Sequence, residues 1–311
     1  MIDCHNLTKR YGPLHAVDDL SFRVEPGEVL GFLGPNGAGK TTTMRILAGF
    51  LPATSGSATV CGFDVDTQSI AAKRRIGYLP EGAPNYPEMS PRSFLALVAD
   101  IRGLKGATRT SRLDEVYGLL HLEPVLEQTI DTLSKGYKRR VGLAQAILHD
   151  PDVLILDEPT DGLDPNQKFE VRQLINQMSQ NKIIVISTHL LEEVDAVCSR
   201  AIIIAHGRIL VDDTPELLKA RSRFHNAVSV KLVDRSKLDE VRGGIAALAE
   251  VDAVEMDGNS DRLTAFPANG RRPLGAITAL ATAKGWEFSE LHLETGRFDE
   301  VFRTITEGAN A

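Results

Sequence analysis

The sequence predicts an α/β protein with a mostly parallel central sheet, followed by a small α+β domain. Strand and helix patterns alternate up to about Leu210, which is typical of a parallel sheet with helices on its faces. Three predicted strands, at 29–33, 153–156 and 183–187, are nearly continuous apolar runs, as expected where both faces of a sheet are covered. After His225 the pattern changes to β-α-β-β-α-β, so we expect a separate fold there.

The composition is that of an ordinary globular protein and argues against several classes. The 311 residues are 42% hydrophobic and 25% charged, enough for one large domain and a small one. A net charge of −7 without a long basic stripe argues against nucleic-acid binding as the main role. Cys4, Cys61 and Cys198 lack metal-site spacing, so we expect a reduced, cytosolic protein. No signal peptide and no bilayer-length apolar run is present, so any membrane role would come through a partner.

A glycine-rich segment matches the phosphate-binding loop G-x-x-x-x-G-K-T. Its residues are Gly34, Pro35, Asn36, Gly37, Ala38, Gly39, Lys40 and Thr41. The strand at 29–33 precedes it and good helix formers follow over 40–47, as the motif requires. Its glycines let backbone N–H groups point at a phosphate, Lys40 adds a charge, and the Thr41 hydroxyl can hold Mg²⁺. We therefore predict a nucleotide site here; a glycine turn that matches by chance is the alternative.

Polar residues follow two further predicted strands. Asp157 and Glu158 come directly after the run 153–156, and His189 follows the run 183–187. The carboxyl ends of parallel strands are where such sheets bind ligands. A single carboxylate could simply begin a loop, and a lone histidine is more often a cap or a packing residue. Two carboxylates in a chain with a phosphate loop favour a functional site.

Other elements of the first 222 residues are predicted from periodicity and from residues that break helices. Short strands are expected at 2–7, 20–24, 57–60 and 76–79, with a turn at 9–12 and a loop at 80–84. Apolar residues at helical spacing predict a helical insertion over about 84–150, whose last helix begins at Ser134 and runs to His149. A turn at 161–165 leads into a helix from Pro165 to Asn181. Tyr11, in the first turn, is by itself more consistent with packing than with binding.

Residues 223–311 are expected to form an accessory domain of the ferredoxin-like type with an extra helix. Strands are predicted at 228–233, 251–256, 263–266 and 286–293, with helices near 238–248, 274–280 and 298–305. The alternation slips near Ser289, which indicates a β-bulge. Trp286 and His292 fit a core or surface role better than a binding role, and no chemistry is visible in this domain.

Residues 1–219 resemble the ATP-binding subunits of ABC transporters, on motifs that are highly specific. Residues 34–41 match Walker A and residues 153–158 match Walker B. The segment Leu133-Ser134-Lys135-Gly136-Tyr137 matches the signature, Gly162-Leu163-Asp164 the D-loop, and His189 the switch histidine. The resemblance implies a P-loop NTPase fold with an antiparallel β subdomain and a helical insertion.

Two departures from the family pattern indicate a subfamily. Glu81 stands where the family usually has glutamine, and Lys135 and Tyr137 replace the third and fifth residues of the usual Leu-Ser-Gly-Gly-Gln signature. The Ser-Lys-Gly-Tyr form resembles gliding-motility, nitrous-oxide-locus and ABC-2 exporter ATPases. Glu81 also adds a negative charge beside the metal and phosphates, so its equivalence to glutamine is open.

The resemblance implies a nucleotide-binding role for a defined set of residues. These are Tyr11, Gly34, Pro35, Asn36, Gly37, Ala38, Gly39, Lys40, Thr41, Thr42, Glu81, Ser134, Gly136 and Asp164. Tyr11 falls where the family stacks an aromatic ring on adenine. Ser134 and Gly136, at a helix N-terminus, would complete the ATP site of a second subunit.

Metal and catalytic roles follow from the needs of phosphoryl transfer to water. Thr41, Glu81 and Asp157 would surround Mg²⁺ with oxygen ligands. Lys40 would neutralise the phosphates, Glu158 would act as base or orient the water, and His189 would contact the γ-phosphate and sense its loss.

We therefore expect the ATPase subunit of an ABC-2-type exporter. Two chains, identical or related, would close head to tail on two ATP molecules and open on hydrolysis. They would dock on separate permease subunits at the inner face of the membrane, through a groove formed by the helical insertion and the Glu81 loop.

Other readings are open but fit the sequence less well. A non-transport ABC ATPase acting on ribosomes or DNA usually has tandem cassettes, long coiled-coil insertions or zinc cysteines. A regulatory protein with a weakened cassette would lack some of Lys40, Asp157, Glu158 and His189. A nucleotide kinase would need a substrate pocket in place of the signature helix. The transported substrate and the role of the accessory domain are not encoded in any motif.

Overall fold

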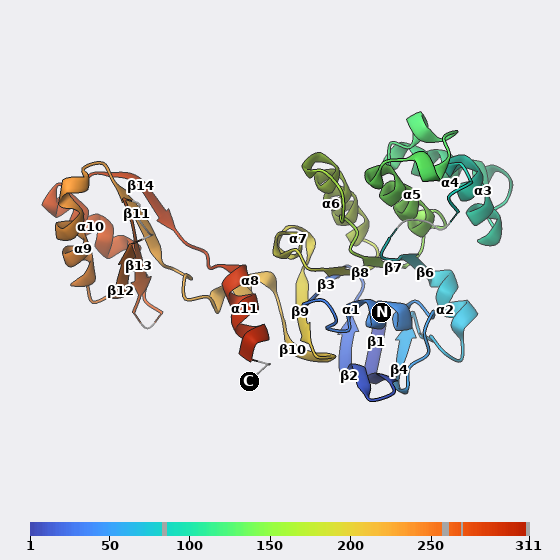
Figure 1. Ribbon diagram of the computed structural model, residues 1–311, viewed down its shortest axis with the longest axis horizontal. Helices are drawn as coiled ribbons and strands as arrows, with labels where there is room; N and C mark the ends of the chain where they lie inside the picture. The colour runs from blue at the N-terminus through green and yellow to red at the C-terminus, as the bar shows by residue number, and fades with distance from the viewer. Residues whose placement is uncertain (83–85, 257–260, 269, 309–311) are drawn as a thin grey trace. The chain divides into compact units, whose positions relative to one another are not determined.

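The computed structural model describes residues 1–82, 86–256, 261–268 and 270–308 and divides the chain into two compact units, Met1–Pro215 and Glu216–Ala311 (Figure 1). Each unit has its own hydrophobic core. The units divide seven residues before the predicted boundary at 222/223, which stays a prediction about independent folding. Among the described residues, no helix has both the length and the apolar character to cross a bilayer.

A six-stranded sheet forms the centre of the first unit. Its strands, in spatial order, are β10 (Arg208–Asp213), β9 (Arg200–Ala205), β3 (Val29–Leu33), β8 (Ile183–Thr188), β7 (Val153–Asp157) and β6 (Ile76–Leu79). All neighbours are parallel except β10 and β9. Every residue of β3, β7 and β8 is buried, as predicted from their apolar runs. The register pairs Leu33 with Thr188 and Asp157 with Ser187, so the three carboxyl ends lie at one edge of the sheet.

Four helices of the first unit lie between its strands, outside the helical insertion. They are α1 (Lys40–Leu47), α2 (Ser69–Arg75), α6 (Pro165–Ser179) and α7 (Leu191–Val197). Both the strand before the phosphate loop and the helix after it have the predicted bounds. Helix α6 begins at Pro165 as predicted, because the Asp164 side chain accepts from the Gln167 N–H and proline suits the first helical position. It ends two residues before the predicted Asn181.

A four-stranded antiparallel sheet packs against the central sheet. Its order is β2 (Leu14–Val24), β1 (Ile2–Tyr11), β4 (Ser55–Val60) and β5 (Phe63–Asp64). The rings of Phe22 and Phe32 meet edge to face with centroids 5.0 Å apart, in a core that both sheets share.

The predicted turn at 9–12 is wrong. Strand β1 continues to Tyr11, which pairs with Leu14 of β2. The turn is therefore only Gly12 and Pro13, and Gly12 supplies the positive φ of 58°. Three register shifts between β1 and β2 disturb the alternation, which is why the sequence pattern hides the end of this strand.

The helical insertion is present between β6 and β7 (Figure 1, green). It contains α3 (Pro91–Ile101), α4 (Gly106–Leu119), the 3₁₀ turns Glu123–Val125 and Ile130–Thr132, and α5 (Lys135–Ile147). Ser90 caps α3 and Pro91 is its first residue. Helix α5 begins directly after Ser134 as predicted, but ends at Ile147 rather than His149. Part of the predicted 80–84 loop lies outside the described residues.

The second unit has the predicted ferredoxin-like order of elements. Its antiparallel strands lie in the order β12 (Val251–Met256), β13 (Arg262–Pro267), β11 (Val228–Leu232) and β14 (Phe288–Leu293). Its helices are α8 (Pro215–Ala220), the 3₁₀ turn Arg235–Lys237, α9 (Leu238–Ala246), α10 (Leu274–Lys284) and α11 (Phe298–Gly308). Lys231 pairs with Glu290 and Leu232 with Phe288, so Ser289 is the extra residue of the predicted bulge. Trp286 lies in the core, and the predicted turn at 257–259 lies outside the described residues.

Candidate functional site

The loop between β3 and α1 has the shape that its glycines predict. Gly37 and Gly39 have φ of 80° and 105°, values that side-chain-bearing residues rarely adopt. A Cβ at Gly39 would overlap the carbonyl oxygen of Ala16, and one at Gly34 would overlap that of Ile204. Pro35, Asn36 and Gly37 are exposed, whereas Ala38, Gly39 and Lys40 are buried.

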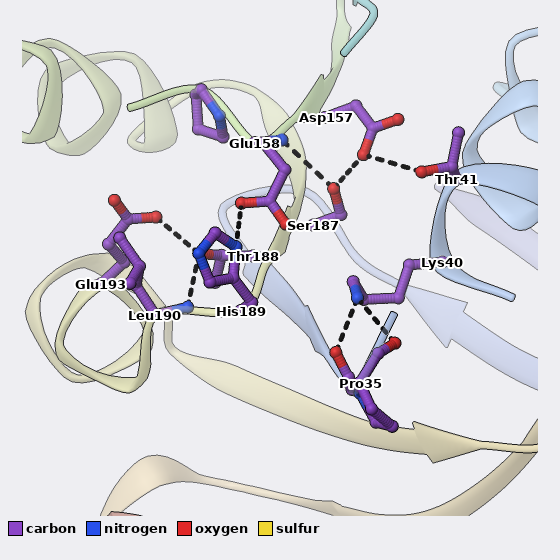
Figure 2. A network of polar contacts seen from close by, with 12 residues as sticks. Pro35, Lys40, Thr41, Asp157, Glu158, Ser187, Thr188, His189, Leu190 and Glu193 are labelled. Atoms are coloured by element: carbon purple, nitrogen blue, oxygen red, sulfur yellow. Dashed lines mark hydrogen bonds and ion pairs between the residues drawn. The ribbon is translucent and has the colours of Figure 1, made fainter. Parts of the chain in front are cut away.

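Lys40 is buried at the start of α1 and points back over this loop (Figure 2). Its Nζ donates to the carbonyl oxygens of Gly34 at 2.6 Å and Pro35 at 3.1 Å. Burial lowers the pKa of Lys40, and the negative charges of Glu158, Asp157 and Glu81 oppose that shift. The loop carbonyls therefore bind the ammonium group, and the three carboxylates favour its charged form.

Asp157 connects the end of β7 to both neighbouring segments. Its Oδ1 accepts from Ser187 Oγ and lies 3.4 Å from the Thr41 hydroxyl (Figure 2). Its Oδ2 is buried and has no hydrogen-bond partner among the described residues. Thr42 is half-buried in the same helical turn as Thr41. The site thus offers one buried carboxylate oxygen, still unpaired, close to a hydroxyl.

Glu158 and His189 meet across the ends of β7 and β8. His189 Nδ1 lies 2.9 Å from Glu158 Oε2, and the imidazole is about half exposed (Figure 2). Glu158 has a φ of 53°, an unusual conformation for a residue with a side chain. Its N–H donates to the backbone oxygen of Ser187 at 3.0 Å. The two residues that the sequence separates by 31 positions are in direct contact.

Thr188 and Glu193 fix the backbone beside His189. The Thr188 hydroxyl donates to Glu193 Oε2 at 2.7 Å and accepts from the Leu190 N–H at 3.0 Å. Glu193 is buried, and burial raises its pKa. Ser187, Thr188 and Glu193 are not among the residues predicted to be functional. The sequence signal that could have indicated the first two is a pair of hydroxyl residues at the end of a buried strand.

Other predicted ligands lie outside this network. Glu81 is exposed in the loop after β6. Ser134 caps α5 by accepting from the Tyr137 N–H at 3.3 Å, and Asp164 caps α6. Tyr11 ends β1, about half exposed, with Lys9 Nζ 5.4 Å from its ring centroid.

Gly136 has a packing role at the junction of α5 and α6. It lies in the first turn of α5, where an added Cβ would be 2.5 Å from Gln167 Oε1. Its small size therefore allows the N-terminal ends of the two helices to pack closely. With Ser134 and Asp164, it forms a second group of predicted ligands, at helix N-termini.

Comparison with known proteins identifies relatives of the chain. The ABC transporter family profile matches residues 17–161. The linearmycin resistance ATP-binding protein LnrL of Bacillus subtilis (strain 168) is 30% identical over 307 residues, 98% of each chain. The Nod factor export ATP-binding protein I of Burkholderia pseudomallei is 38% identical over 218 residues, 70% of this chain and 72% of the relative. A probable multidrug ABC transporter ATP-binding protein, YbhF of Escherichia coli K12, is 34% identical, but the match spans only 38% of its length.

Solved structures share the fold of the first unit. An ATP-binding subunit of an ABC transporter superposes with a TM-score of 0.66 at 28% identity, over 71% of this chain and 92% of that one. The dimeric MJ0796 cassette superposes with a TM-score of 0.64 at 23% identity, over 69% and 99%. These cassettes therefore correspond to about the extent of the first unit. By its sequence relatives, this chain belongs to the ATP-binding proteins of the ABC transporter family.

Proposed function

We propose that the chain binds and hydrolyses ATP to drive export through separate membrane subunits. The observation that supports this most directly is the convergence of Lys40, Thr41, Asp157, Glu158 and His189 at the carboxyl edge of one parallel sheet. Exporter-associated names among the sequence relatives support the direction of transport. The substrate would be set by the membrane subunits.

The donor set fits Mg²⁺ when ATP is bound. Asp157 offers a buried, unpaired carboxylate oxygen and Thr41 a hydroxyl close by, which are ligands that a hard cation prefers. No group of three His, Cys, Asp or Glu side chains suited to a metal occurs in the described parts of the chain. The remaining ligands would come from phosphate, water and Glu81. The metal would supply charge neutralisation on the phosphates.

Each residue of the network has a distinct task in this proposal. Lys40 moves its hydrogen bonds from the loop carbonyls to the phosphates, because an anion competes better for an ammonium group than an amide oxygen does. Glu158 accepts a proton from the attacking water or orients it. His189, in contact with Glu158, positions that carboxylate and contacts the γ-phosphate.

A second copy of the cassette would complete the site. Ser134, Gly136 and Asp164 lie at the N-terminal ends of α5 and α6, where N–H groups and the helix dipole favour an anion. We propose that these ends contact the ATP held by a partner subunit, identical or related, in a head-to-tail dimer. Tyr11 is proposed to stack on adenine. The dimer would work in the cytoplasm, bound to a permease at the inner face of the membrane.

Replacing Glu158 with Gln tests the proposed chemistry. Glu158→Gln should retain ATP affinity and lose hydrolysis, since loss of a general base usually costs ~10²–10⁴ in rate. Single-turnover hydrolysis of Mg-ATP by the full chain is the measurement, with ATP affinity measured by calorimetry. A loss of less than about tenfold, or under about 1.4 kcal/mol of barrier, would place the base elsewhere.

Lys40→Ala is the comparator because it should fail in a different way. Loss of a charged hydrogen bond is worth ~1.5–3 kcal/mol, so ATP affinity itself should fall roughly tenfold to a hundredfold. Unchanged affinity in this variant would contradict the role given to Lys40. A wild-type chain with neither binding nor hydrolysis would contradict the proposed function as a whole.

A further inference from the structure

Arg139, in the second turn of α5, is buried and binds backbone from two separate loops. Only 6% of the residue is exposed. Its Nε donates to Pro159 O at 3.3 Å, its Nη1 to Pro80 O and Gly82 O at 2.9 Å each, and its Nη2 to Asp157 O and Glu158 O. A guanidinium group has five N–H donors in a fixed fork, and this one contacts five carbonyl oxygens.

The acceptors are backbone carbonyl oxygens at and just beyond the ends of two strands. Those of residues 157–159 belong to the segment that leaves β7, and those of Pro80 and Gly82 to the loop that leaves β6. Within the described residues, no ion pair joins Arg139 to a carboxylate. Buried carbonyls need hydrogen-bond donors, and this one side chain supplies donors to both loops. Glu158 O also accepts from the Asp161 N–H at 3.1 Å.

Glu158 is the acceptor whose conformation matters most for hydrolysis. Its φ of 53° is sparsely populated and persists only where the surroundings hold the backbone. Ser187 O accepts from its N–H, and its carbonyl oxygen accepts from both Arg139 and the Asp161 N–H. This backbone conformation directs the carboxylate towards His189.

We propose that Arg139 is a positioning residue that couples the Pro80–Gly82 loop to the carboxylate of Glu158. The inference rests on the proposed ATP hydrolysis. A displacement of the loop changes the hydrogen bonds at Nη1, and the rigid guanidinium transmits the change through Nη2 to the peptide that carries Glu158. Neither Lys40 nor the phosphate loop is among its contacts, so we expect nucleotide binding to depend on it less than hydrolysis does.

Arg139→Lys separates positioning from binding. An ammonium group keeps the charge but lacks the planar fork, so it cannot bridge the two loops in the same way. A misplacement of about 1 Å can cost ~10² in rate, so kcat should fall by roughly tenfold to a hundredfold while KM for ATP changes much less. Steady-state hydrolysis by the full chain gives both parameters, and thermal unfolding reports stability.

Arg112→Lys is the matched control. Arg112 also donates to two backbone oxygens, Ile147 O at 2.9 Å and Leu148 O at 3.1 Å, but at the opposite end of α5. It touches neither loop, so this variant should change stability without a selective loss of kcat. Equal kcat values for Arg139→Lys and Arg112→Lys would overturn the coupling.

A double variant tests whether Arg139 acts through Glu158. If it does, Arg139→Lys should add little to the rate loss already caused by Glu158→Gln. A merely structural role predicts the full further loss instead. Multiplicative losses would therefore contradict the proposal even if Arg139→Lys alone is slow.

If Arg139→Lys does not fold, Gly82→Ala provides a second test of the coupling. Gly82 has a φ of 94° with open space around an added Cβ, so the substitution strains only the loop. Its kcat should fall. Gly103→Ala makes the same change at φ 78° in the loop after α3, so it should lower Tm by a similar amount and leave kcat unchanged. An active Gly82→Ala enzyme with wild-type kcat would reject the coupling, whereas an inactive wild-type chain would reject the proposed function.

Discussion

His149 shows how burial changes the pKa of a single side chain. It follows α5, with Nε2 3.1 Å from the oxygen of Ile76 and Nδ1 buried without a partner among the described residues. Burial, helped by the positive charge of Arg102, lowers its pKa from 6.5 to about 4. The imidazole is therefore neutral in the folded protein at pH values where it is half protonated in the unfolded chain.

This shift predicts a loss of stability in mild acid. The unfolded chain binds the proton more readily, so the free energy of unfolding falls as pH drops from 6.5 towards 4, by at most about 1.4 kcal/mol per pH unit. His149→Gln should reduce the slope of Tm against pH, because it removes the titrating imidazole. Its amide can still donate to the backbone oxygen of Ile76. His121→Asn is the control, since His121 is exposed and asparagine tolerates its φ of 49°. Equal slopes in all three proteins would contradict the assignment.

Functional residues were predictable from the sequence where they lie at the end of a buried strand. Asp157, Glu158 and His189 follow buried strands, and the register of β7 and β8 brings their ends together. Arg139 was not predictable, because an arginine in a charged helical segment gives no sign that it faces inward. Its partners are also backbone oxygens, and no side-chain pattern in the sequence records these.

The junction of α5 and α6 is the contact between elements with the clearest consequence. Gly136 lies against the Gln167 side chain, which in turn accepts from the Asp164 N–H at 3.4 Å as part of the α6 cap. The two helix ends that we propose to reach a partner's ATP are therefore in contact with each other. A side chain at position 136 would fit only if the Gln167 amide moved.

Gly136→Ala should destabilise the protein through this contact. The added methyl group would displace the Gln167 amide and weaken the α6 cap, at a cost of ~0.5–2 kcal/mol. Gly118→Ala in α4 is the control, since only Glu123 Oε1 comes within 4 Å, at 3.8 Å. Alanine is the better helix former there and should stabilise by up to ~1 kcal/mol. Denaturant unfolding measures both, and the same sign in both variants would argue against the contact.

Helices and strands were predictable to within a few residues where periodicity and caps agree. The strand and helix around the phosphate loop have their predicted bounds, because an apolar run and a glycine loop mark their limits. Strand β1 was not predictable to its end, because its pairing with β2 contains bulges. In the second unit the slip near Ser289 was visible, since one bulge in an otherwise regular alternation leaves a clear signature.

In the whole molecule, the two units differ in how well known proteins match them. The solved cassettes cover 68–71% of this chain, about the extent of the first unit. LnrL aligns over 98% of both chains, so the length of the second unit is shared with at least one relative. The second unit has its own core and contains none of the residues proposed for ATP chemistry. Its role is therefore best tested by removing it.

Truncation after Pro215 should leave a folded chain that binds ATP with unchanged affinity. This boundary suits the structure better than Ser222, because the intervening segment makes contacts within the second unit: Ser222 Oγ donates to Glu300, and Gly296 lies against the carbonyl oxygen of Lys219. A chain that ends at Ser222 should therefore be less stable than one that ends at Pro215. Calorimetry and thermal unfolding of both forms measure this, and loss of ATP binding in the 1–215 chain would show that the units share one core.

The truncated chain also distinguishes two roles for the second unit. If the unit stabilises a dimer, hydrolysis per chain by residues 1–215 should fall more steeply than that of the full chain as protein is diluted. In the proposed dimer, two cassettes must meet to complete each site. We expect this outcome, since the exposed Leu291 and Leu293 on β14 offer apolar surface to a second copy. If activity per chain is the same for both forms at every concentration, the unit does not hold the dimer and acts instead on the membrane partner or on regulation.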